Sequence, residues 1–136
     1  MTLRIPNEGE NRAVGTLLGK YTAETLRVKL YSNNVTPAET DTSASYTEVT
    51  GGGYAAVDLT AANWTITEGA PTEAAYPQIT WTFSAAIGNV YGYYVVGVTS
   101  GKVWFAERFS DGPYNVAASG DAIKVTPKYT YADTLD

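Results

Sequence analysis

The fold is decided by residues 79–109, which read ITWTFSAAIGNVYGYYVVGVTSGKVWFAERF. Apolar residues alternate with threonines over 79–83, which is the period of a strand with one buried face. The run 90–99 is apolar on both sides, as in a central strand that is covered on both faces. A Ser-Gly turn then leads into 102–109. The stretch therefore predicts a strand followed by a β-hairpin.

Shorter strands flank this stretch. Alternating apolar residues predict strands over 25–31, 46–50, 55–59, 64–67 and 122–129. Pro127 has no amide hydrogen, so we expect the end of the last strand to lie at the edge of a sheet. About eight short strands separated by turn signals predict an all-β fold, an antiparallel β-sandwich of jelly-roll-like type, over residues 21–130. A charged fraction of only 17% with 12% aromatic residues suits strands.

The two ends of the chain read differently from its middle. Residues 1–20 predict an N-terminal arm with a short helix at most, because several glycines weaken a helix there. Residues 131–136 predict a C-terminal tail. The arm nevertheless contains more apolar residues than a tail without a function requires, namely Leu3, Ile5, Val14, Leu17 and Leu18. We therefore expect the arm to fasten the domain to a partner and to contribute little to the fold.

The chain contains no His and no Cys, which removes the common catalytic triads, the cysteine nucleophile and the conventional zinc sites. Carboxylates remain, and Asp58, Glu73, Glu107 and Asp111 are the residues that a glycosidase pair would need. Ion pairs and turns explain them better. The prediction is no enzyme, with no catalytic, cofactor-binding or metal-binding residue assigned, although an irregular calcium site stays open.

Two local patterns resemble known sites and fail on inspection. The segment 96–102 ends in Gly-Lys like a phosphate-binding loop, but Val103 stands where Ser or Thr should hold Mg²⁺, and a strand follows in place of a helix. Glu39 and Asp41 lack the glycine and the distal glutamate of an EF-hand.

Charge and hydropathy limit the partners. The net charge is −5 and no segment gathers Lys and Arg into a stripe, so nucleic acid is not expected as a partner. No apolar run approaches the roughly 20 residues that span a bilayer, and the first residues lack the apolar region of a signal peptide. We expect no membrane association and synthesis in a cytoplasm.

The aromatic series from 91 to 114 is the most distinctive feature of the sequence. Its members on the strands and turns are candidates for a partner interface: Tyr91, Tyr93, Trp104, Phe109 and Tyr114. Packing in the core is the simplest explanation for most of them. A strand that is aromatic on both faces nevertheless has more apolar surface than one core face absorbs, and the surplus is typical of subunit interfaces. Stacking on sugar rings is the third alternative.

Several strings of the sequence together resemble a family of small phage and prophage proteins associated with capsid genes. The strings are LRVKLYSNNVTP (26–37), GGGYAA (51–56), NWTI (63–66), GNVYGYYV (88–95), FAERF (105–109) and GDAIKVTP (120–127). The likeness covers roughly residues 3 to 128.

The resemblance implies a virion structural protein of a tailed bacteriophage, of the capsid decoration or cement type. Such proteins are commonly small β-sandwiches that clamp neighbouring subunits of the major capsid protein, often as homotrimers. The implied location is the capsid exterior, after synthesis in the bacterial host cytoplasm. The family supplies no catalytic residues. The alternative is a tail or baseplate tip, or a carbohydrate-binding module that recognises host surface glycans.

Overall fold

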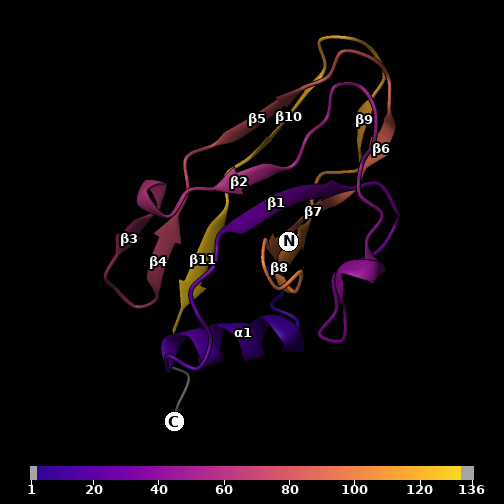
Figure 1. The fold of residues 1–136 in the computed structure, drawn as a ribbon. Coiled ribbons are helices and arrows are strands. Elements are labelled where there is room, and N and C mark those ends of the chain that lie inside the picture. Colours follow the sequence, from indigo (N-terminus) through magenta and orange to yellow (C-terminus); the bar gives the residue numbers. More distant parts are fainter. Residues whose placement is uncertain (1–2, 133–136) are drawn as a thin grey trace.

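The computed structural model describes residues 3–132 and consists mainly of antiparallel strands in two layers (Figure 1). One layer is a four-stranded sheet with the order β2-β1-β7-β8, formed by Val57–Leu59, Leu26–Tyr31, Gly92–Gly97 and Val103–Arg108. The other layer contains the pair β5-β10, formed by Ile79–Thr82 and Ala122–Val125, and the sheet β11-β4-β3, formed by Lys128–Tyr131, Thr72–Ala75 and Thr65–Thr67. The pair β6-β9, formed by Gly88–Val90 and Tyr114–Val116, lies at one end. The predicted all-β sandwich is confirmed.

The main core lies between the layers. Val28 and Leu30 of β1 pair in register with Val95 and Tyr93 of β7, and all four side chains are buried. Because directly opposite residues of antiparallel strands point to the same face, these side chains form one continuous apolar surface. The opposite layer contributes further buried residues, among them Ile79, Trp81, Phe83, Ile123 and Val125. Burial of these side chains is the main driving force for the fold.

The second face of the four-stranded sheet is also covered. Tyr31, Tyr46 and Tyr94 form a second buried cluster there, in which the rings of Tyr46 and Tyr94 stack at 4.7 Å. Tyr46 comes from the long connection between β1 and β2, which therefore closes this face. Every residue of β7 is buried as a result, which confirms the prediction of a central strand covered on both faces.

Several predicted strand boundaries were wrong. The expected strand 46–50 is reduced to an isolated bridge between Tyr31 and Glu48. The expected strand 90–99 is interrupted at Tyr91, which separates β6 from β7. The expected strand 122–129 is two strands in different sheets, β10 and β11. Pro127 lies between them, fully buried, and its carbonyl accepts a hydrogen bond from the Tyr76 amide at 2.9 Å. A proline here ends the first pairing because it has no amide hydrogen to donate.

The N-terminal segment is docked on the sheet. Helix α1, Asn7–Leu17, packs against β8, and Arg4 exchanges backbone hydrogen bonds of 2.9 Å with Ala106. The carboxylate of Glu8 accepts a 2.7 Å hydrogen bond from the Val103 amide. These contacts make the segment part of the fold and correct the expectation of an arm that contributes little to it. Of the predicted tail 131–136, Tyr131 belongs to β11, and residues 133–136 lie outside the described part of the chain.

Gly9 sets how closely the helix approaches the sheet. A Cβ atom at this position would lie 2.3 Å from the Trp104 carbonyl oxygen and 2.8 Å from that of Val103. Both atoms belong to the backbone of a strand, so the helix would have to move away. Gly9 is therefore required for close docking.

We expect Gly9→Ala to lower the free energy of unfolding by about 1–3 kcal/mol, the usual range for overpacking. Denaturant unfolding of the full chain measures this, with Glu10→Ala on the exposed side of the same helix as the control. Alanine favours an isolated helix over glycine by about 1 kcal/mol. A Gly9→Ala variant that is more stable than the parent would therefore show that the helix is not docked this closely.

Candidate functional site

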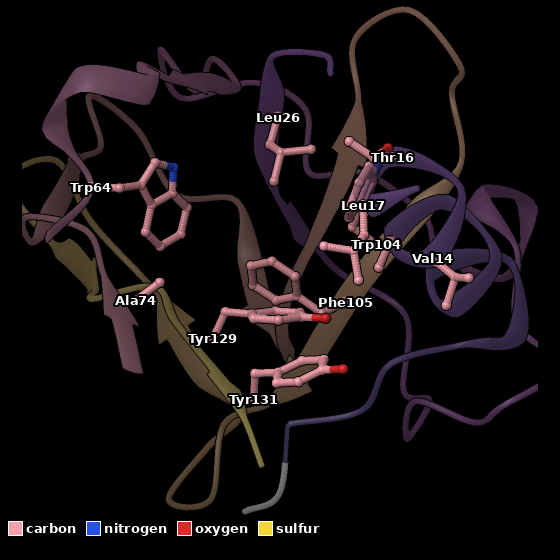
Figure 2. Close-up of a pocket in the computed structure, with 11 residues that line it drawn as sticks. Val14, Thr16, Leu17, Leu26, Trp64, Ala74, Trp104, Phe105, Tyr129 and Tyr131 are labelled. Carbon is pink, nitrogen blue, oxygen red and sulfur yellow. The ribbon is translucent and has the colours of Figure 1, made fainter. Parts of the chain in front are cut away.

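The most distinctive surface feature is an apolar groove between helix α1 and the sheet β11-β4-β3, with a volume of about 340 Å³ (Figure 2). We call it the α1–β11 groove. It is lined by Ala13, Val14, Thr16 and Leu17 of α1, by Trp64, Ala74, Tyr129 and Tyr131 of the second layer, and by Leu26, Trp104 and Phe105 of the four-stranded sheet. Figure 2 shows Trp64 and Ala74 facing Leu17 and Trp104 across the hollow.

The two walls follow from local periodicity. In α1, positions 10, 13, 14 and 17 fall on one side of the helix, because residues three and four apart share a face. In the small sheet, Tyr129 pairs with Ala74, and Ala74 pairs with Ile66. Directly opposite residues share a face, so this row points toward the groove. Tyr131 follows two residues after Tyr129 and points the same way.

A bulge in β8 supplies part of the lining. Val95 pairs with Phe105 and Val96 pairs with Val103, so Trp104 has no residue opposite it in β7. A bulge bends the strand and redirects the side chain of the extra residue. Trp104 thereby comes to lie beside α1, and the neighbouring Phe105 ring lies 5.6 Å from that of Tyr129.

Large apolar side chains around the groove are exposed. Val14 and Leu17 on α1 are 55% and 74% exposed, and Leu18, which follows the helix, is 75% exposed. Ile66 and Tyr131 on the sheet are 72% and 67% exposed. Single exposed apolar residues are common, whereas a contiguous group beside a hollow is typical of an interaction surface. Burial raises the pKa of the Tyr129 hydroxyl, and the nearby Tyr131 and Glu10 add to this effect, so Tyr129 stays neutral. The groove suits apolar contact, not proton transfer.

A buried carboxylate network supports the groove from behind. The Glu24 side chain is only 3% exposed, and its oxygens accept hydrogen bonds from the amides of Thr99 and Ser100 at 3.1 and 2.9 Å. The Ser100 hydroxyl donates at 2.9 Å. Arg12 of α1 donates at 3.0 Å, and the Trp104 indole donates at 3.4 Å. One carboxylate thus ties the helix to the β7–β8 hairpin and to a residue that lines the groove.

The pKa of Glu24 reflects this environment. Burial favours the neutral acid and would raise the pKa, but hydrogen bonds from the Ser100 amide and hydroxyl, together with the charge of Arg12, outweigh burial. The net result is a pKa below the ordinary value, so Glu24 is ionised at neutral pH. An ionised carboxylate with this many donors holds the neighbouring segments in place.

Only part of the predicted interface lies at this groove. Leu17 and Trp104 line it, and Leu18 follows directly after the helix. Leu3 and Ile5 are partly buried against the main core instead. Their apolar character therefore serves the docking of the N-terminal segment.

The remaining predicted residues lie elsewhere. Tyr93 is buried, and its hydroxyl donates to Glu107 at 3.1 Å. Tyr91 is half-buried under the guanidinium group of Arg108, which lies 5.1 Å from the ring centroid. Phe109 and Tyr114 stack on each other at 4.6 Å near the turn that follows β8. Contacts within the fold explain the aromatic side chains of Tyr91 and Tyr93 without a partner protein. The Phe109–Tyr114 pair, in contrast, is partly exposed.

The carboxylates considered for glycosidase chemistry have partners of their own. Asp58 forms an ion pair with Arg27, and the Arg27 hydrogen bond lowers the pKa of Asp58. Glu73 lies 3.9 Å from Lys128, and Asp111 accepts a hydrogen bond from Tyr114. Glu107 accepts from Tyr93, as described above. Asp58 and Glu73 therefore form cross-strand ion pairs and Asp111 is a turn residue, as expected, whereas Glu107 has a hydrogen bond from Tyr93 in place of the expected ion pair.

The sequence pattern does not single out most of the groove. Leu26, Trp64, Ala74, Phe105, Tyr129 and Tyr131 also line it, as does Val14 of the predicted apolar arm, and Ile66 adjoins it. The alternation of Trp64 with Ile66, and of Tyr129 with Tyr131, was a usable signal. In the second case the signal is hidden, because residues 122–129 read as one strand that ends before Tyr131, whereas β11 begins at Lys128.

Among residues 3–132, no group of three or more acidic residues is placed to hold a metal ion. No helix in that part of the chain is long and apolar enough to cross a membrane. Comparison with known protein families, curated proteins and solved structures found no match to this chain.

Proposed function

We propose that this chain is a virion structural protein of a tailed bacteriophage, a decoration protein that binds the major capsid protein on the capsid exterior. The observation that carries the proposal is the α1–β11 groove with its exposed apolar rim. Apolar and aromatic surface of this kind forms the centre of protein–protein interfaces. The resemblance of residues 26–37, 88–95 and 105–109 to capsid-associated phage proteins supports the capsid as the assembly to which the chain binds.

A decoration protein acts by mass action. It binds the assembled lattice and not the free subunit, so it stabilises the shell by RT ln(1 + [L]/Kd). An oligomer that contacts neighbouring subunits at once gains further from effective concentration. The proposal accordingly includes a homo-oligomer, for which the resemblance implies a trimer, and includes no enzymatic activity, cofactor, nucleic acid or membrane.

The test is binding to capsids that lack this protein. Purified chain added to such capsids should co-sediment with them at a fixed ratio and raise their resistance to heat, and an electron cryomicroscopy map should place it on the outer shell. Absence from the shell in that map would contradict the proposal.

The second candidate is a tail tip or carbohydrate-binding module. The partly exposed stack of Phe109 and Tyr114, with Asp111 beside it, is the observation that favours it, because sugar rings stack on aromatic faces and hydrogen-bond to nearby carboxylates. Calorimetric titration with host polysaccharide distinguishes the two. Binding there, with none to capsids, would favour the second candidate.

A further inference from the structure

We propose that the turn between β7 and β8 is a binding site for a carboxylate, which Glu24 fills in this structure and which a free carboxylate fills when the Glu24 side chain is removed. We call this site the carboxylate cradle. It consists of the backbone at Gly97, Thr99 and Ser100, the Ser100 hydroxyl, and the side chains of Arg12 and Trp104. The cradle is independent of the proposed capsid function, which assigns no ligand to this turn.

The donors of the cradle are divided between the two oxygens of the Glu24 carboxylate. Oε1 accepts hydrogen bonds from the amides of Thr99 and Ser100 at 3.1 and 2.9 Å. Oε2 accepts from the Ser100 hydroxyl at 2.9 Å, from Arg12 at 3.0 Å and from the Trp104 indole at 3.4 Å. A carboxylate is an acceptor at both oxygens and carries the charge that Arg12 requires. The arrangement therefore suits a carboxylate better than a spherical anion or a neutral amide.

Gly97, the last residue of β7, leaves the space in which the carboxylate lies. A Cβ atom at this position would be 2.1 Å from Oε1 and 2.3 Å from Cδ of Glu24. Gly97 is not one of the glycines with a positive φ, so its backbone conformation does not require glycine. The close approach of a carboxylate is the feature of the structure that does.

A hollow beside the cradle gives a ligand access from solvent. It has a volume of about 350 Å³ and is lined by Arg12, Lys20, Tyr21, Thr22, Ala23, Glu24 and Thr99. Lys20 is exposed there and forms no ion pair within residues 3–132. Without Glu24 the hollow would carry two positive charges, which attract an anion. The Arg12 guanidinium also lies over the Tyr21 ring, 4.2 Å from its centroid, so Glu24 is not its only support.

The cradle also explains the segment 96–102, whose Gly-Lys ending resembles a phosphate-binding loop. Amides of this segment do bind an anion, but that anion is a carboxylate. Lys102 is directed elsewhere, since its Nζ lies 3.7 Å from the Glu8 carboxylate.

The first experiment adds acetate to the full chain carrying Glu24→Ala. This substitution removes a CH₂–COO⁻ group, and acetate supplies the same group as a separate molecule. With a dissociation constant of about 50 mM, acetate at about 0.5 M should raise the ratio of folded to unfolded chain about tenfold relative to chloride. The amide resonances of Thr99 and Ser100 should shift with acetate and reach saturation, as measured by nuclear magnetic resonance.

The parent and Glu24→Gln are the matched controls, because a side chain fills the cradle in both. Acetate should change their stability only through its general effect on protein surfaces. Acetamide is the control ligand, since it has the shape of acetate without the charge, and it should not stabilise Glu24→Ala. If Glu24→Ala is unfolded in chloride, acetate and not acetamide should restore its folded circular dichroism spectrum.

The second experiment uses Gly97→Ala, which tests the cradle in a chain that retains Glu24. The added methyl group should displace the carboxylate and make hydrogen exchange at the Thr99 and Ser100 amides at least about tenfold faster. Gly69→Ala is the matched control, because a Cβ there would lie 3.3 Å from its nearest neighbour and the φ of Gly69 is not positive. Its Thr99 and Ser100 amides should exchange as in the parent.

Three results would overturn the proposal. The first is acetate that stabilises Glu24→Ala no more than it stabilises the parent, with unchanged Thr99 and Ser100 resonances. The second is acetamide as effective as acetate, because the cavity would then take any small molecule. The third is a Gly97→Ala variant that exchanges like Gly69→Ala, because the carboxylate would then not lie against Gly97.

Discussion

Replacing Trp81 by alanine is expected to lower the free energy of unfolding by about 3–5 kcal/mol. Trp81 is the centre of β5 and is only 6% exposed in the core between the two layers. Its indole Nε1 donates a 2.9 Å hydrogen bond to the Ala55 carbonyl, and its ring stacks near that of Tyr54. Alanine would leave a cavity in the core between the two layers and would leave the Ala55 carbonyl without its hydrogen-bond donor. Each of these changes lowers the stability of the fold.

Thermal and urea unfolding measure this loss. For a chain of this length it corresponds to a decrease in Tm of roughly 10–20 °C. Trp81→Phe is the matched control, since it retains an aromatic ring but removes the indole donor, and it should lose clearly less. A Trp81→Ala variant that melts within a degree or two of the parent would contradict the position of β5 in the core.

Replacing Glu24 by alanine should lower the free energy of unfolding by a similar amount, about 3–5 kcal/mol. The substitution removes one partner of a buried ion pair and leaves the other charge unpaired. Arg12, whose side chain is 18% exposed, would lose its partner. The amides of Thr99 and Ser100 would lose their acceptor as well. The matched control is Asp58→Ala, which breaks the more exposed pair with Arg27 and should cost about 1 kcal/mol or less. Equal losses of unfolding free energy in Glu24→Ala and Asp58→Ala would show that the buried Glu24 network stabilises the fold no more than an exposed ion pair does.

The stability that ionised Glu24 contributes should depend on pH. Its native pKa lies below the ordinary value of 4.5, so the unfolded chain binds the proton more readily than the folded chain. The contribution is therefore complete above the ordinary pKa and is lost as the pH falls through the lower native value. Urea unfolding at neutral pH and in acid should show this loss in the parent and a smaller one in Glu24→Gln. Parallel pH profiles for the two proteins would contradict it.

Elements that depend on local side-chain patterns could be predicted from the amino-acid sequence alone. Alternation over 25–31 and 79–83, and the double-sided apolar run after 90, identified β1, β5 and the central strand β7, because side-chain periodicity reports which faces of a strand are buried. The hairpin from β7 to β8 followed from a turn between two such runs. An all-β class was readable for the same reason. A short helix at most was expected among residues 1–20, whereas α1 spans 11 residues.

The contacts between these elements could not be predicted from the sequence and follow from the three-dimensional packing. The α1–β11 groove joins Leu17, Trp64, Trp104 and Tyr129, which are far apart in the chain, and no local pattern encodes their proximity. The break between β10 and β11 at Pro127 depends on which sheet the second strand joins. The sequence does not settle this, because a proline is also tolerated within a single strand at the edge of a sheet. Docking of the N-terminal helix depends on the space that Gly9 leaves against β8. Packing between distant segments settles these features, and it is a property of the whole chain rather than of any window within it.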